Sequence, residues 1–118
     1  MNSLTIRYLL AALEGFRQLG DRRGECEALL TLGQEYEGGQ KYEEALDFLT
    51  VCENLANEIG DKEILTVCTH SLGIVYENGR KDFDIAREKF SLSLELVKDL
   101  DSPHATVLMK NSVGLNYA

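Results

Sequence analysis

The pentapeptide LGQEY at residues 32–36 recurs forty residues later as LGIVY at residues 72–76. After a further forty-one residues the pattern appears again as VGLNY at residues 113–117. A glycine inside a helix costs about 1 kcal/mol relative to alanine, so its repeated presence needs a structural reason. We expect the glycine of each copy to allow close approach of a second helix, while the tyrosine fills the space beside the contact. These structural positions are Gly33, Gly73, Gly114, Tyr36, Tyr76 and Tyr117.

Other landmarks keep the same spacing. Gly20-Asp21 recurs as Gly60-Asp61, which is typical of a helix end followed by the N-cap of the next helix. Ala45 and Ala86, the small residues expected to press against Gly33 and Gly73, stand forty-one residues apart rather than forty. This slip predicts a single inserted residue in the turn at residues 79–82.

The apolar residues within each unit follow a helical period. Between residues 42 and 59 they recur in steps of three and four, which predicts an amphipathic helix. No segment alternates in the manner of a strand. The chain is therefore predicted to be all-α, with about six helices at residues 3–19, 22–37, 41–59, 62–77, 82–100 and 103–117.

The spacing of these residues resembles the tetratricopeptide repeat, whose W-x2-L-G-x2-Y…A-x3-F pattern describes a helical hairpin. In the first full unit, the pattern corresponds to Leu29, the pair Leu32-Gly33, Tyr36, Ala45 and Leu49. The tryptophan and the closing proline are missing, and the period exceeds the usual 34 residues. The longer unit resembles the subclass in LGN-type scaffold proteins and peptide-sensing bacterial regulators. The resemblance implies a right-handed superhelical stack of antiparallel hairpins, an α-solenoid.

The resemblance divides the chain as one array over residues 1–118. Residues 1–20 correspond to the second helix of a truncated repeat, 21–60 and 61–101 to two full repeats, and 102–118 to the first helix of another. Solenoids normally carry polar capping helices at their ends, and neither end of this sequence resembles one. We therefore expect a fragment of a longer array; the alternative is a complete small protein.

Repeats of this family bind partners on the concave wall formed by the first helix of each hairpin. Helical counting from the Leu-Gly pair gives the inward positions, a mixture of apolar and polar side chains suited to an extended or helical peptide. The predicted partner-binding residues are Glu27, Leu30, Gln34, Glu37, Val67, His70, Ile74, Glu77, Leu108, Asn111 and Leu115. The alternatives are that these positions are simply solvated or covered by a neighbouring helix. For His70, a place on the helix surface competes with a role in binding a partner or sensing pH.

The net charge of −8 indicates a neutral or basic protein or peptide partner and argues against nucleic acid or an anionic membrane surface. The three cysteines are widely spaced, with no CxxC pair, so we expect them to pack as small apolar residues and predict no metal site or cofactor. No signal peptide or membrane-spanning segment is evident, which leaves a cytoplasmic location as the default.

The sequence contains no glycine-rich phosphate loop, no H-E-x-x-H motif and no nucleophile elbow, so we expect no enzyme activity. Two non-catalytic functions remain open. One is a protein- or peptide-binding scaffold module. The other is a regulatory or self-assembly segment that packs on other domains or on copies of itself through its exposed end helices.

Overall fold

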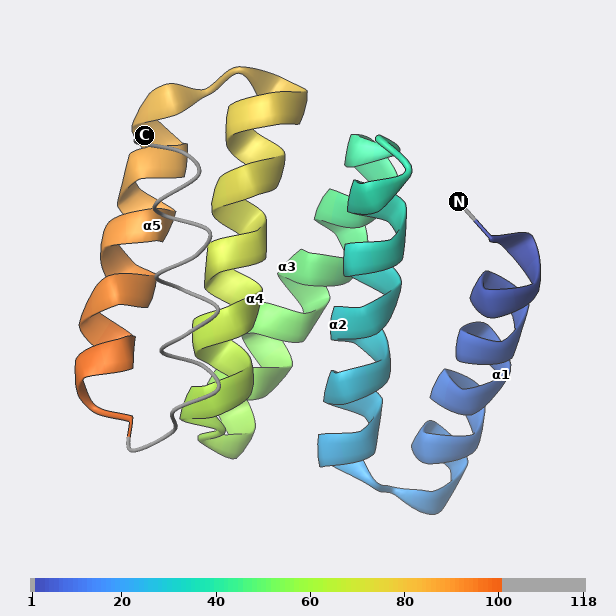
Figure 1. Cartoon of the computed structure of the whole chain (residues 1–118). Coiled ribbons are helices and arrows are strands. Elements are labelled where there is room, and N and C mark those ends of the chain that lie inside the picture. The colour runs from blue at the N-terminus through green and yellow to red at the C-terminus, as the bar shows by residue number, and fades with distance from the viewer. Residues whose placement is uncertain (1, 101–118) are drawn as a thin grey trace.

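A computed structural model describes residues 2–100, which form five α-helices and one π-helical turn and contain no strand (Figure 1). The all-helical prediction is confirmed. The sixth predicted helix, with Gly114 and Tyr117, lies outside the described residues. The elements are α1 (Ser3–Leu19), α2 (Arg22–Gly38), α3 (Tyr42–Ile59), α4 (Lys62–Val75), the π turn η1 (Tyr76–Arg80) and α5 (Phe83–Lys98).

The helix starts and ends predicted at the Gly-Asp links are confirmed. Gly20 and Gly60 adopt left-handed φ angles of 69° and 70°, a conformation that costs glycine little. Asp21 and Asp61 then accept hydrogen bonds from the backbone N–H of Gly24, at 2.9 Å, and of Ile64, at 3.0 Å. Each carboxylate thus satisfies an orphan donor at the positive end of its helix.

The turns inside the two hairpins use left-handed residues other than glycine. Gly39 keeps a right-handed φ of −87°, and the left-handed positions are Gln40 (φ 60°) and Lys81 (φ 55°). Gln40 and Lys81 are forty-one residues apart and play the same part in their turns. Both side chains are exposed, so neither of these strained backbone positions lies in the core.

The extra residue of the second unit lies in the π turn. In the first hairpin, the Lys41 N–H donates to the carbonyl of Tyr36, five residues back, whereas Asp82 donates to Tyr76, six residues back. A π turn accommodates one additional residue in this way. The insertion therefore lies in the π turn at residues 76–80, which overlaps the predicted turn at residues 79–82.

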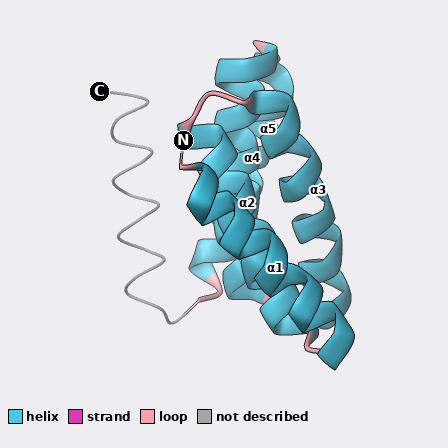
Figure 2. Ribbon diagram, turned by 90° about the vertical axis from the view of Figure 1, so that its right-hand side faces the viewer, coloured by secondary structure: helices cyan, strands magenta, loops and turns pink. Residues whose placement is uncertain are grey.

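The described helices pack in a nearly linear order. Each contacts its neighbours in the chain, and α2 also contacts α4, whereas α1 contacts neither α3, α4 nor α5. Figures 1 and 2 show α2 and α4 side by side on the front of the molecule, with α3 behind them. The two ends of the described fold, α1 and α5, consequently lie on opposite sides of this central group.

The core follows the apolar stripes of the helices. Its fully buried large side chains include Leu29, Leu32, Leu49, Leu72 and Val75. The prediction that the cysteines pack as small apolar residues is confirmed, because all three are fully buried free thiols. They are Cys26, Cys52 and Cys68.

Close approach at the repeated glycines is confirmed, but through side chains other than the expected ones. A Cβ atom on Gly33 would lie 2.5 Å from Leu49 Cγ, and a Cβ atom on Gly73 would lie 2.6 Å from Phe90 Cε1. The expected contacts were Ala45 and Ala86, which are buried one helical turn earlier. The longer side chains reach the glycines because a helical residue leans toward the N-terminus of its helix.

The same register relates the rest of the two hairpins. The sulfur atoms of Cys26 on α2 and Cys52 on α3 are 3.7 Å apart, and both residues are fully buried. Their counterparts forty and forty-one residues later, Thr66 on α4 and Ser93 on α5, are fully buried as well. Small side chains thus stand at the same crossing in both hairpins.

None of the helices within residues 2–100 combines the length and the apolar character needed to cross a lipid bilayer.

Candidate functional site

The structure brings the predicted binding residues of α2 and α4 onto neighbouring helices. We call this surface the α2–α4 face. It is made of Glu27, Leu30, Gln34 and Glu37 on α2, Val67 and Ile74 on α4, and Glu77 on η1. The predicted residue His70 on α4 is buried and does not contribute to this surface. The other three predicted residues, Leu108, Asn111 and Leu115, lie outside the described part of the chain.

The α2 half of the face is open to solvent. Glu27 and Gln34 are exposed, while Leu30 and Glu37 are half-buried. The Glu27 carboxylate accepts from Arg23 Nε at 3.1 Å, one turn earlier on the same helix. This half therefore offers polar groups around one partly covered leucine.

The α4 half is more enclosed and more apolar. Val67 and Ile74 are half-buried, and so is Glu77, which lines a hollow of about 190 Å³ together with Phe83 and Arg87. The two halves therefore differ in character although they occupy equivalent positions in the repeat.

His70 is buried, contrary to the expectation that a histidine on this helix wall lies at the surface. Only 6% of the residue is exposed, and its ring is tilted against Phe90 with centroids 5.3 Å apart. Neither ring nitrogen has a hydrogen-bond partner in the structure. Burial lowers the pKa of His70 below its ordinary value, because the charged form would lose hydration without gaining a partner.

We expect His70 to make the protein less stable as the pH falls through and below about 6.5, the ordinary pKa of histidine. The unfolded chain binds the proton more readily than the folded chain, so acidification favours unfolding. Urea denaturation at a series of pH values should show a steeper loss of stability in the wild type than in His70→Leu. Equal slopes in the two proteins would contradict this account, because all other titrating groups are shared.

Glu37 is a half-buried carboxylate on the face. Burial raises its pKa above the ordinary value, and it has no ion pair with another described residue. A cation docked beside Glu37 would compensate for its lost hydration. This position is therefore a suitable contact for a lysine or arginine of a partner.

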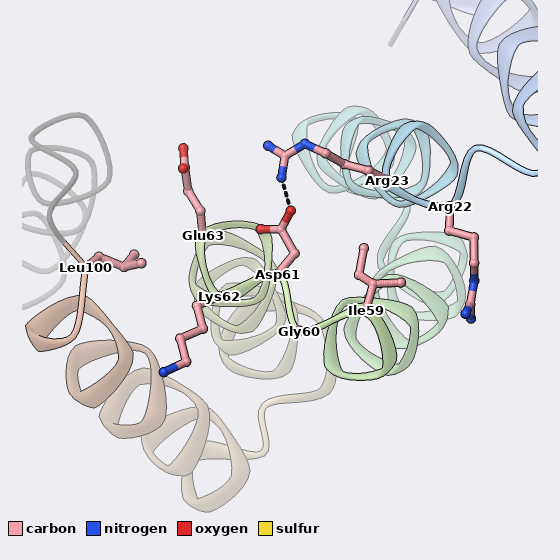
Figure 3. A pocket seen from close by; sticks show the side chains of 8 residues that line it. All are labelled: Arg22, Arg23, Ile59, Gly60, Asp61, Lys62, Glu63 and Leu100. Atoms are coloured by element: carbon pink, nitrogen blue, oxygen red, sulfur yellow. Dashed lines mark hydrogen bonds and ion pairs between the residues drawn. The ribbon is translucent and has the colours of Figure 1, made fainter.

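Helical counting missed the first turn of the face. Arg23 and Glu63, one turn before Glu27 and Val67, lie on the same side of α2 and α4, away from Ile59 at the end of α3 (Figure 3). Arg23 also pairs with Asp61, the N-cap of α4, and so connects the two hairpins. Their forty-residue spacing was a signal present in the sequence, and extending the count by one turn finds them.

A wide, open depression of about 640 Å³ lies beside this first turn, at the junction of α3 and α4. Its lining combines charges of both signs with a few apolar groups: Arg22, Arg23, Ile59, Gly60, Asp61, Lys62, Glu63 and Leu100. The hollow extends the α2–α4 face at one end.

Among residues 2–100, no group of three or more histidine, cysteine or acidic side chains is arranged to hold a metal ion. In comparisons with known proteins, no family model matches the chain, and no curated protein matches its sequence.

Proposed function

We propose that this chain is a tetratricopeptide-like scaffold module that binds a neutral or basic protein or peptide segment on the α2–α4 face. The observation that supports the proposal is the contact between α2 and α4, the equivalent helices of two successive hairpins, which carry the predicted binding positions. Chemistry at an active site is not part of the proposal.

The packing supports a solenoid as the underlying architecture. The two hairpins have matching caps, matching left-handed turn residues and matching glycine contacts. The contact between α2 and α4, without one between α1 and α3, is expected when the first helices of successive hairpins line the inner wall. On this basis α2 and α4 form the wall that receives the partner.

The charge distribution supports a basic partner. Glu37 and Glu77, one at the end of α2 and one in the π turn, both lack an ion pair with another described residue. Leu30 and Ile74 provide half-buried apolar contacts between the polar positions. A peptide with lysine or arginine spaced around an apolar side chain matches this arrangement.

The test begins with selection of dodecapeptides from a random display library, followed by fluorescence anisotropy with synthetic peptides. We expect the selected peptides to be rich in lysine and arginine and to bind more weakly at higher salt. In the variant Glu37→Lys/Glu77→Lys, affinity should fall at least about tenfold, because attraction at two positions becomes repulsion.

The matched control is Glu14→Lys/Asp47→Lys, which makes the same change of charge at exposed sites on α1 and α3. Its affinity should stay within about twofold of the wild type, because these sites do not touch the bound peptide. An equal loss of affinity in both variants would mean that the effect arises from the net charge of the protein and not from this face. Unchanged binding in the first variant would exclude this face.

A further inference from the structure

The first hairpin holds two thiols in contact at the point where its helices cross. The sulfur atoms of Cys26 on α2 and Cys52 on α3 are 3.7 Å apart. Each sulfur also lies against the backbone of the opposite helix, 3.6 Å from the Cys52 carbonyl oxygen and 3.5 Å from the Cys26 carbonyl oxygen. The two residues therefore occupy matching positions, with little more than one cysteine side chain between the two backbones.

This arrangement suits a disulfide bond. A disulfide joins sulfur atoms about 2 Å apart and bridges Cα atoms that are at most about 7 Å apart. Because the two thiols already touch, a rotation of each side chain brings them closer to bonding distance. The equivalent crossing of the second hairpin holds Thr66 and Ser93, which fill the space but cannot form a cross-link. Both described hairpins thus have small side chains at this crossing, and the first one has thiols.

The fold protects these thiols while the hairpin is closed. Cys26 and Cys52 are both fully buried. Burial, together with the neighbouring Cys52 thiol, raises the pKa of Cys26 to about 12, so its thiol stays protonated at neutral pH. Since the thiolate is the reactive form, oxidation requires a local opening in which one of the two thiols reaches solvent.

A third thiol competes for Cys52. Cys68 on α4 donates to the carbonyl oxygen of Leu49 at 3.1 Å. Its interaction with Cys52 is the main cause that raises the pKa of Cys52, ahead of burial. Cys68 directs its hydrogen to the backbone of α3, whereas Cys26 and Cys52 face each other with their sulfur atoms in contact. The geometry therefore favours a bond between Cys26 and Cys52.

We propose that Cys26 and Cys52 form a redox modification site, at which a small dialkyl disulfide such as oxidised glutathione converts them to a disulfide that joins α2 to α3. One protein thiolate attacks the small disulfide, which releases one small thiol and leaves a mixed disulfide on the protein. The second protein thiolate attacks the protein sulfur of that mixed disulfide and releases the second small thiol. Two protein thiols and one small disulfide thus become one protein disulfide and two small thiols, and each departing thiolate takes up a proton lost by a protein thiol.

The size of the mixed disulfide explains why the reaction continues to the cross-link. A glutathione group on either sulfur does not fit a crossing where both cysteines are fully buried. The cross-link needs less space than the two touching thiols, so closure of the hairpin favours loss of the second glutathione. The bond then holds α2 against α3. The reaction does not require peptide binding at the α2–α4 face.

The test compares the pairing of the three cysteines in the folded and in the unfolded chain. The wild-type protein is diluted from urea into a buffer in which oxidised glutathione predominates, and a second sample stays in concentrated urea with the same buffer. After equilibration, acid stops the exchange and N-ethylmaleimide blocks the remaining thiols. Trypsin then places the three cysteines on separate peptides, and mass spectrometry identifies each linked pair. These peptides are residues 24–41, 42–62 and 63–80.

Loop length sets the expectation for the unfolded chain. Cys52 and Cys68 are sixteen residues apart, whereas Cys26 and Cys52 are 26 residues apart. The shorter loop closes more easily, so in urea the bond between Cys52 and Cys68 should be about twofold more abundant. In the folded chain the order should reverse, with the bond between Cys26 and Cys52 at least about tenfold in excess, because the fold places these two sulfurs in contact.

Two serine variants complete the test. Cys68→Ser should form the cross-link, and its oxidised form should melt at least about 5 °C above its reduced form, because the bond restricts the unfolded chain. Cys52→Ser is the matched control, with a serine where Ser93 stands in the second hairpin, and it should form no protein disulfide and show no rise.

Three results for the folded wild type would overturn the proposal. They are a main product that links residues 42–62 to 63–80, mixed disulfides without a cross-link, and three thiols that remain free. A cross-linked Cys68→Ser that melts below its reduced form would also contradict it, because the fold would then not accommodate the bond.

Discussion

Replacement of Gly33 by valine should destabilise the protein by about 2–3 kcal/mol, because the new side chain overfills a packed crossing. The position of a Cβ atom at Gly33 lies 2.5 Å from both Leu49 Cγ and Leu49 Cδ2, and Leu49 is itself fully buried. The leucine therefore has no solvent to move into. Urea denaturation followed by circular dichroism measures the loss.

Two further variants identify the cause. Leu49→Ala alone should cost about 2–5 kcal/mol through loss of buried atoms, but the double variant with Gly33→Val should lose less than the sum of the two changes. Gly15→Val, in a helix position with open space, should change stability by less than about 0.5 kcal/mol at low protein concentration. A similar loss at Gly15 and Gly33 would mean that close packing is not the reason for the repeated glycine.

Replacement of Phe90 by alanine should have the largest effect in the second hairpin, about 3–5 kcal/mol. Phe90 is only 3% exposed, and its ring lies against both the backbone of Gly73 and the ring of His70. Because a small domain is stable by only about 5–15 kcal/mol, the variant should lose a large part of its stability. Thermal unfolding should show a midpoint lower by more than about 10 °C.

Leu92→Ala is the control on the same helix, since Leu92 is 46% exposed. It should cost less than about 1 kcal/mol, because most surface substitutions have small effects. If both variants were equally destabilised, α5 would be held by its general apolar character and not by the fit of Phe90 to Gly73.

The sequence predicts the helices and their caps well because each unit repeats the same local chemistry. Asp21 and Asp61 follow helix-ending glycines, and a carboxylate at that position is favourable because it caps the N-terminus of the next helix. The glycine contacts are equally predictable in kind, since a recurrent helical glycine is costly without a close neighbour. These features depend on residues near one another in sequence.

Features that depend on tertiary packing are harder to predict from the sequence. The identity of the side chain against Gly33 depends on the direction in which Leu49 leans, which composition does not reveal. Gln40 occupies a left-handed turn position although glycines stand beside it. The burial of His70 against Phe90 likewise depends on how α4 and α5 pack, whereas a helical pattern alone places the residue on the concave wall.

The candidate site shows the same division. Helical phase predicted which positions of α2 and α4 share a face, but it gave no measure of their exposure. Glu27 is open to solvent, whereas Glu37 is partly desolvated with a raised pKa. That difference decides which carboxylate gains most from a bound cation, and it arises from burial rather than from residue type.

The solitary contact of α1 with α2 has a dynamic consequence. A helix held by one neighbour can detach while the remaining helices keep their packing, so its amide protons should exchange with deuterium through a local opening. Amides in the middle of α4, which contacts α2, α3 and α5, would exchange only through a larger unfolding event. The protein would then show a gradient of protection along its length, with its most exchangeable helix at the N-terminal end of the described fold.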